Sequence, residues 1–413
     1  MERQGRFRIL FFLFPIIAVF TATLSCFADP TIKLGIEVLT LDHLEMIQGK
    51  KLAILIAPTS LNHQLSHSID ILAKYSTIQV IFTGNQYFRP TISGGSETPQ
   101  LDERTNSPVI EITDPLKRPS RKDLRGAEAI VIDFQDIGIR YFNYVTLLAQ
   151  FLELARQSEL PVIVLDRPNP INGYTVSGPV LEVNFRSRYG VYPIPLIYGM
   201  TIGELALYFN KVFGLGANLT VIGMENYSRV MTFSETGLYW AMPSDHLPEA
   251  DSPSYYAITG FLGEMGVFST GVGATRPFHY ILAPWLDGAA LANKISKYNL
   301  PGVRFLPISI KPFYGLFQLK KIPGIEIVIL DHLQYDPFLT GVAILRSLWD
   351  LYPDKIPLKN PAISESLDTL LGGSAIRNSI LKGIPLFQIH ASMQPAIRDF
   401  LSKRKAFIMY PEN

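Results

Sequence analysis

Cysteine is nearly absent from this chain of 413 residues, with Cys26 as its single occurrence. One cysteine cannot form a disulfide within the chain, and it lies in an N-terminal segment that we expect to be removed. The mature protein therefore has no residue for an internal disulfide, a thiolate-bound zinc ion or a thiol nucleophile.

The chain also has no large excess of charge of one sign, and it lacks the sequence motifs of common cofactor-binding sites. The formal net charge is +1, and no basic run suggests nucleic acid as a partner. The glycine-rich phosphate-binding turns do not occur, which argues against a nucleotide cofactor. The histidines form no H-E-x-x-H signature, so no metal is expected. G-x-S-x-G is absent, which leaves serine hydrolase chemistry without support.

The first 28 residues have the pattern of a signal peptide. Three arginines precede an apolar stretch from Ile9 to Thr23, and Cys26-Phe-Ala28 forms a cleavage site before Asp29. We expect export to the periplasm or the extracellular space. Two alternatives remain open, an imperfect lipobox ending at Cys26 and an uncleaved apolar anchor. Contact with a membrane is expected only through this N-terminus.

The mature chain predicts an α/β fold. Its length exceeds the size at which one hydrophobic core usually stops growing, so two domains are expected. Apolar runs alternate with segments of helical spacing; the runs lie at 51–57, 78–82, 128–133 and 161–166, and the helical segments at 65–75 and 144–157. This order predicts a parallel sheet with right-handed crossovers. A polar stretch at 241–256 is predicted to be a linker, and strands and helices mix beyond it.

Polar side chains stand directly after two of these apolar runs. They are Asp133, Gln135, Asp136 and Arg140 after one run, and Asp166, Arg167 and Asn169 after the other. Ligands of open α/β sheets bind beyond the carboxyl ends of the strands, so these side chains are candidates for a site. The alternative is a scaffold of salt-bridged strand ends, in which Arg140 pairs with Asp133 or Asp136.

Three more charged residues are candidates. Glu182 precedes Arg186 and Arg188, and from spacing alone an exposed ion pair is favoured over an acid with a cationic partner. Glu264 lies among glycines that allow close approach of a ligand. Arg276 precedes Pro277, and its planar fork is suited to a carboxylate.

Carboxylate-driven hydrolysis is the chemistry that these residues allow. One acid protonates a leaving oxygen while another carboxylate activates water or attacks directly. Sugar sites often add aromatic platforms, for which the candidates are Tyr192, Tyr198, Trp240 and Trp285.

Several longer motifs resemble the NamZ family of exo-β-N-acetylmuramidases. They follow in order over nearly the whole mature chain: Asp133-Phe-Gln-Asp-Ile-Gly-Ile-Arg140, Leu165-Asp-Arg-Pro-Asn-Pro170, Tyr192-Pro-Ile-Pro195, Gly199-Met-Thr-Ile-Gly-Glu-Leu205, Ala274-Thr-Arg-Pro-Phe278 and Ala283-Pro-Trp285. The resemblance implies a Rossmann-like N-terminal domain (33–250), a smaller α/β C-terminal domain (251–413) and an active site in the cleft between them. It also implies removal of β-linked N-acetylmuramic acid from the non-reducing end of peptidoglycan fragments, without a cofactor.

Departures from the family pattern fall at polar loop positions. The family's Phe-Gly-Pro-Glu-His-Gly motif has its Glu and His replaced by Asn85 and Gln86, which keep hydrogen bonding but cannot exchange a proton as Glu and His do. Its His before Gly-Met-Thr is replaced by Tyr198. The residue pattern and the resemblance together leave four candidate catalytic acids: Asp166, Asp136, Glu182 and Glu264.

Substrate binding is expected from a second set of residues. Arg140, Arg167 and Arg276 would bind the lactyl carboxylate, and Asn169 the N-acetyl or hydroxyl groups. The remaining members of the set are Asn85, Gln86, Asp133, Gln135 and Tyr198. The expected partner is a peptidoglycan-derived sugar or muropeptide. The alternative function is a catalytically degenerate protein that binds such fragments without turnover.

Overall fold

The structure is a computed structural model, and it describes residues 31–84, 88–92, 100–114 and 117–412. The expected signal peptide at 1–28 lies outside the described residues, as do Asn85 and Gln86. Ile32–Asn413 forms one compact unit. Within the described residues, no helix has the length and apolar character needed to cross a membrane.

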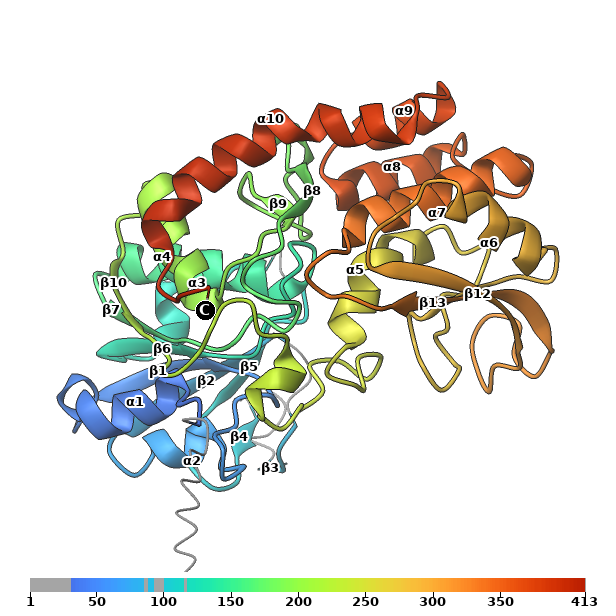
Figure 1. Ribbon diagram of the computed structural model, residues 1–413. Coiled ribbons are helices and arrows are strands. Elements are labelled where there is room, and N and C mark those ends of the chain that lie inside the picture. The colour runs from blue at the N-terminus through green and yellow to red at the C-terminus, as the bar shows by residue number, and fades with distance from the viewer. Residues whose placement is uncertain (1–30, 85–87, 93–99, 115–116, 413) are drawn as a thin grey trace, which may run out of the picture. The chain divides into compact units, whose positions relative to one another are not determined.

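A six-stranded parallel sheet confirms the predicted α/β fold (Figure 1). Its strands in spatial order are β10 (Asn218–Ile222), β7 (Pro161–Leu165), β6 (Ala129–Asp133), β1 (Lys51–Ile56), β2 (Thr77–Thr83) and β5 (Val109–Glu111). Every neighbouring pair is parallel. The central strands β1, β6 and β7 are buried almost throughout, which is why their sequences are unbroken apolar runs.

Helices cover both faces of this sheet (Figure 1). One face packs against α3 (Asn143–Ser158) and α4 (Ile202–Val212), and the other packs against α1 (Gly35–Asp42) and α2 (Ser68–Leu72). Alternate residues of β1 enter the two cores, as the two-residue period of a strand requires: Ala53 and Leu55 on the α3 side, Leu52 and Ile54 on the α1 side.

Local signals set the ends of two helices. A capping box begins α4, since the Thr201 hydroxyl accepts from the Glu204 backbone and the Glu204 carboxylate accepts from the Thr201 backbone. The helix predicted at 65–75 is shorter than expected, because Leu65 has a left-handed φ of 59° and α2 begins only at Ser68.

A three-stranded antiparallel sheet organises the C-terminal part. Its order is β11 (Tyr280–Leu282), β13 (Ile322–Ile329) and β12 (Val303–Ile310). The helices of this part are α5 (Ser252–Gly263), α6 (Gly288–Ser296), α7 (Pro337–Leu351), α8 (Pro361–Leu371), α9 (Ala375–Leu381) and α10 (Leu386–Arg404). The linker predicted at 241–256 is wrong beyond residue 251, because α5 begins at Ser252 with a proline in its first turn.

Two small sheets complete the fold, and the last helix connects its two parts. The two small antiparallel sheets are β3 (Thr91–Ile92) with β4 (Leu101–Asp102) and β8 (Ser177–Val180) with β9 (Pro195–Ile197). Phe400 of α10 belongs to the core between α3, α4 and the parallel sheet. The Arg404 guanidinium donates to the Gly199 carbonyl at 2.5 Å. The C-terminal helix is therefore part of the N-terminal fold as well.

Candidate active site

Asp133 and Arg167 form a buried, bidentate ion pair at the carboxyl ends of β6 and β7. Arg167 Nε lies 2.5 Å from Oδ1 of Asp133, and Nη2 lies 2.9 Å from Oδ2. The Ser68 hydroxyl donates to the same carboxylate, and Arg167 Nη1 donates to the Leu61 carbonyl at 2.9 Å. Adjacent strands thus bring together the side chains that the sequence placed at this edge.

The space beside this ion pair is small. Gln135 and Arg167 border a cavity of about 20 Å³, which has room for about one water molecule. The Gln135 amide donates to the carbonyls of Asp136 and Pro168 at 2.8 and 2.6 Å. The geometry therefore supports a role for Asp133, Gln135 and Arg167 in holding the strand ends, and their binding of substrate stays a prediction.

The Asp166 carboxylate is fully buried and accepts four hydrogen bonds. Oδ1 accepts from the Arg167 and Gly203 backbones at 2.9 and 2.7 Å. Oδ2 accepts from the Thr201 and Tyr410 hydroxyls at 2.7 and 2.5 Å. Burial raises the pKa of Asp166 to about 7. The acceptor positions of the carboxylate are therefore occupied. Through these hydrogen bonds the side chain connects the end of β7 to the start of α4 and to the C-terminal segment.

Asp136 is buried as well, but one of its oxygens is free. Oδ2 accepts from the Gly138 backbone at 2.7 Å and from the Tyr198 hydroxyl. Oδ1 has no hydrogen-bond partner among the described residues. Burial raises the pKa of Asp136 to about 6, against the lowering effect of both donors. Because Oδ2 receives both hydrogen bonds, the proton of the neutral acid resides on the buried Oδ1.

Tyr144 lies near both Asp136 and Gly84, the residue that follows β2. The ring of Tyr144 stacks on Phe134 with centroids 4.6 Å apart. A Cβ at Gly84 would lie 3.0 Å from that tyrosine ring. Burial raises the pKa of Tyr144, and the charge of Asp136 adds to the effect. Gly84 directly precedes the two positions that depart from the family's Glu-His pair. Tyr144 is therefore a common neighbour of this segment and of Asp136.

A hollow of about 460 Å³ lies at the C-terminal end of α5, within the size range of ligand pockets. Its lining includes Tyr256 of α5, the exposed Glu264, and Ser269 and Thr270 of the following loop. Burial raises the pKa of Tyr256, and the Glu264 charge contributes to that shift. Glu264 is the predicted acid that the structure places in this hollow.

The aromatic wall of the hollow was missed by the sequence analysis. Tyr256 and Phe278 both line it, with ring centroids 4.6 Å apart in an edge-to-face contact. Phe278 has a left-handed φ of 69°, a conformation that costs about 1–3 kcal/mol for a non-glycine residue and often marks a functional site. The available signal was the place of Phe278 in the Ala274–Phe278 motif.

Three of the four expected platforms pack elsewhere. Tyr192 stacks on Phe213 at 4.5 Å, and Trp285 packs edge-on against Tyr352 at 5.1 Å. Trp240 donates from Nε1 to the Leu247 carbonyl at 2.9 Å. Each ring is part-exposed and already has these contacts within the fold, so a role as a sugar platform stays a prediction. Tyr198 is instead fully buried as the donor to Asp136.

Arg140 does not pair with Asp133 or Asp136. Its buried guanidinium donates only to carbonyls, those of Pro179 and Ile194 at 2.9 Å each and those of Leu370 and Leu371 at 3.1 and 2.7 Å. Burial lowers the pKa of Arg140 to about 9. The side chain joins the negative end of α8 to β8 and to the residue before β9. The alternative in which Arg140 pairs with Asp133 or Asp136 is therefore wrong, and binding of a lactyl carboxylate stays a prediction.

Glu182 does not form the ion pair that its spacing favoured. It is exposed beside the end of α8, where its backbone donates to the Gly372 carbonyl at 2.8 Å. The guanidinium of Arg186 lies 5.9 Å from the ring of Tyr192, and that of Arg188 lies 4.8 Å from the ring of Tyr189. The sequence spacing is compatible with a pair, but aromatic rings are the partners these arginines meet.

Asn169 and Arg276 also have protein partners. The Asn169 amide donates to the Met200 carbonyl at 2.9 Å, and its Oδ1 accepts from the Ile171 backbone at 3.1 Å. Arg276 is part-exposed and donates to Glu326 at 2.7 Å. Their expected roles in substrate binding stay predictions. Asn85 and Gln86 lie outside the described residues, so their roles do too.

Comparison with known proteins gives matches over almost the whole chain. A model of the N-terminal part of the exo-β-N-acetylmuramidase NamZ matches residues 52–251, and a model of its C-terminal part matches residues 254–410. The sequence is 33% identical over 384 residues to the peptidoglycan β-N-acetylmuramidase NamZ of Bacillus subtilis (strain 168). The aligned region covers 92% of this chain and 92% of that protein.

Two solved structures share the fold. A DUF1343 family protein from Bacteroides fragilis NCTC 9343 is 30% identical with a TM-score of 0.85, covering 92% of this chain and 99% of that one. A second DUF1343 family protein of the same organism is 23% identical with a TM-score of 0.72, covering 93% of this chain and 100% of that one.

Proposed function

Because the chain belongs to the NamZ family of exo-β-N-acetylmuramidases, we propose that it is an exo-acting glycoside hydrolase of peptidoglycan fragments. It releases β-linked N-acetylmuramic acid from their non-reducing ends. Family membership favours this function over a protein that binds muropeptides without turnover. Within the structure, the observation that carries the proposal is the buried Asp136 carboxyl, with a pKa of about 6 and a free Oδ1.

Asp136 acts as the general acid in this proposal. Its Oδ1 proton passes to the glycosidic oxygen as the bond between that oxygen and the anomeric carbon breaks. The resulting carboxylate keeps two hydrogen bonds at Oδ2, from Gly138 and Tyr198, which stabilise the negative charge. In this assignment no proton has to pass through the positions of Asn85 and Gln86.

Glu264 is the second carboxylate. It is exposed in the hollow beside Tyr256 and Phe278, whose rings offer an apolar face to a sugar. From there it activates water or attacks the anomeric carbon on the face opposite to the acid. Environment separates the two roles, because burial favours the protonated form of Asp136, whereas Glu264 is exposed to water and substrate.

The lactyl carboxylate of N-acetylmuramic acid requires a cation, and the donors of Arg140 and Arg167 are largely engaged within the fold. Arg188 is exposed and donates to the Tyr189 hydroxyl at 2.7 Å. This hydrogen bond raises the pKa of Arg188, and the charge of Glu264 adds to the effect. We therefore assign the lactyl carboxylate to Arg188, which the sequence analysis considered only as a partner of Glu182.

Release of free N-acetylmuramic acid from a MurNAc–GlcNAc disaccharide tests the function. The protein is purified without residues 1–28, and the isomeric GlcNAc–MurNAc disaccharide serves as the control that an exo-acting enzyme of this specificity leaves intact. Release from the first substrate alone supports the proposal. A rise in melting temperature without release supports the binding alternative. Absence of both effects means that the ligand is a different one.

Export is part of the same proposal. The arginines and the apolar stretch before Asp29 support secretion to the periplasm or the extracellular space, where peptidoglycan lies. Cell fractionation with N-terminal sequencing of the recovered protein tests it. A mature N-terminus at Asp29 in the soluble exported fraction is expected, and recovery from the cytoplasm with an intact Met1 would contradict it.

A further inference from the structure

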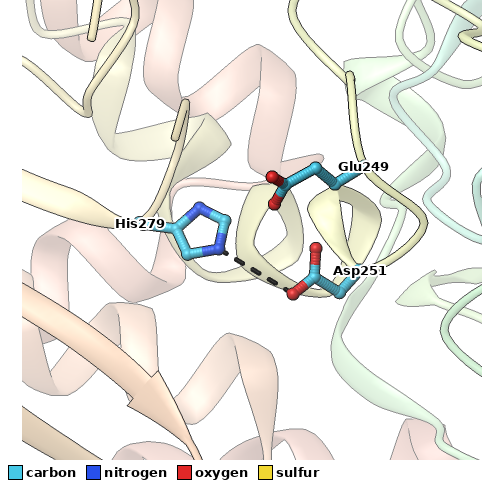
Figure 2. Close-up of side chains that lie close together, drawn as sticks. All are labelled: Glu249, Asp251 and His279. Carbon is cyan, nitrogen blue, oxygen red and sulfur yellow. Dashed lines mark ion pairs between the residues drawn. The ribbon is translucent and has the colours of Figure 1, made fainter. Parts of the chain in front are cut away.

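Three side chains that can bind a metal converge beside the N-terminus of α5 (Figure 2). Glu249 and Asp251 precede the helix, and His279 directly precedes β11. Their ligand atoms all lie within 4.8 Å of one another. Glu264 lies at the other end of α5, so the 12 residues of the helix separate the cluster from the hollow by about 18 Å.

The buried ring of His279 is oriented as a ligand. Its Nδ1 lies 2.9 Å from the Pro277 carbonyl, which can only accept, so Nδ1 carries the hydrogen. Nε2 is therefore the lone-pair nitrogen, and it has no hydrogen-bond partner among the described residues. The ring stacks on Tyr255 with centroids 3.5 Å apart. A carbonyl that fixes the tautomer of a histidine is the usual outer partner of a metal-bound imidazole.

The carboxylates of Asp251 and Glu249 face this nitrogen. Asp251 Oδ2 lies 3.9 Å from Nε2 of His279, and its buried Oδ1 has no hydrogen-bond partner among the described residues. Two ligands that each lie about 2.0–2.2 Å from a zinc ion are separated by up to about 4 Å. Figure 2 shows the Glu249 carboxylate directed into the same space. Arg276, a cation near this group, donates to Glu326 at 2.7 Å.

An ion pair between His279 and Asp251 explains less of this geometry. The 3.9 Å separation between Nε2 and Oδ2 exceeds the reach of a hydrogen bond. The unpartnered Oδ1 of Asp251 and the approach of Glu249 would still be unexplained. One bound cation accounts for the positions of all three side chains, those of His279, Asp251 and Glu249.

We propose that Glu249, Asp251 and His279 bind a divalent transition-metal ion, with Zn²⁺ as the representative. Carboxylates alone would suit calcium or magnesium, and the imidazole nitrogen shifts the preference to the first-row transition metals. The ion joins the segment before α5 to β11, at the junction of the two family matches, which end at residue 251 and begin at residue 254. Its role is to stabilise this junction, and it goes beyond the proposed hydrolysis.

Zinc binding by the purified full chain, stripped with a chelator, tests the proposal. Equilibrium dialysis with elemental analysis is expected to find one Zn²⁺ per chain. His279→Gln is expected to weaken binding at least about 100-fold, since loss of an outer partner alone costs about 10–100-fold. Zinc should raise the melting temperature of the wild type and leave that of the variant unchanged. His43→Gln, a substitution outside the cluster, is the matched control and should bind like the wild type.

Two results would overturn the proposal. One is the absence of stoichiometric binding to the wild type at micromolar free zinc. The other is equal affinity in the wild type and His279→Gln. If that variant does not fold, the exposed Glu249 decides instead: Glu249→Gln should lower the affinity at least about tenfold, and unchanged affinity would reject the site.

Discussion

Tyr198 donates its hydroxyl proton to Oδ2 of Asp136 in the interior of the protein. Tyr198 directly follows β9 and Asp136 lies beyond β6, so this bond joins two loops that are distant in the sequence. Burial raises the pKa of Asp136 to about 6, and the tyrosine limits that rise because its hydrogen bond favours the carboxylate. The pair therefore sets the pH range in which Asp136 carries a proton.

Replacing Asp136 tests it as the general acid. Asp136→Asn is expected to lower kcat for release of N-acetylmuramic acid by about 10²–10⁴-fold, the usual contribution of general acid catalysis. Steady-state kinetics with circular dichroism as the folding check measures this. Asp42→Asn, at an exposed position, should keep wild-type kinetics. Wild-type turnover in Asp136→Asn would remove this residue from the mechanism.

Removing the Tyr198 hydroxyl should shift the pH profile. Its hydrogen bond lowers the pKa of Asp136, so Tyr198→Phe raises that pKa. A general acid works below its pKa, and the alkaline limb of kcat/KM should therefore move up by about 1–2 pH units, the equivalent of one charge-assisted hydrogen bond. The exposed Tyr174→Phe is the control and should keep the wild-type profile. An unshifted limb in Tyr198→Phe would show that another group titrates.

Glu264 and Glu182 should differ sharply in their effect on turnover. Glu264→Gln removes the carboxylate in the hollow and is expected to lower kcat/KM by about 10²–10⁴-fold. Glu182→Gln changes an exposed side chain at the end of α8 and should leave kcat/KM unchanged. Measuring both variants on the same disaccharide separates these two predicted acids. The reverse order of effects would assign the second carboxylate to Glu182.

Asp166 should make the unfolding free energy fall as pH rises from about 4 to about 7. Its folded pKa of about 7 lies above the usual value of about 3.9. The stabilising contribution is then fully present below the unfolded pKa and is lost as pH rises through about 7. Urea unfolding at several pH values measures the unfolding free energy. Its decrease with rising pH should be less steep in Asp166→Asn than in the wild type. An equal pH dependence of the unfolding free energy in both proteins would contradict the burial argument. Loss of turnover in Asp166→Asn with wild-type stability would favour a catalytic role for Asp166.

The ion pair between Asp133 and Arg167 should stabilise the folded protein. Asp133→Ala leaves a buried guanidinium without its carboxylate and is expected to cost about 3–5 kcal/mol of unfolding free energy. Adding Arg167→Ala should cost less than the sum of the single changes, because the charge left unpaired is then removed as well. Urea unfolding of the two single variants and the double variant measures this coupling. Strict additivity would mean that the two side chains act independently.

Much of the fold follows from the sequence alone. The unbroken apolar runs of β6 and β7 predicted buried parallel strands, and the residues Thr201 and Glu204 have the spacing of the capping box that begins α4. The ordered motifs predicted the family that the comparisons then matched. These features depend on neighbours along the chain, through strand alternation, helix capping and turn geometry, so a single sequence contains them.

The roles of the acids depend on the tertiary structure. Asp136 and Asp166 both follow buried strands, and nothing local distinguishes them. Tyr410, 244 residues further along, completes the hydrogen bonds of Asp166, whereas Oδ1 of Asp136 has no hydrogen-bond partner among the described residues. Similarly, His279 meets Glu249 and Asp251 only because α5 and β11 bring them together. Desolvation and coordination depend on which atoms surround a group in space, and only the packed chain determines that.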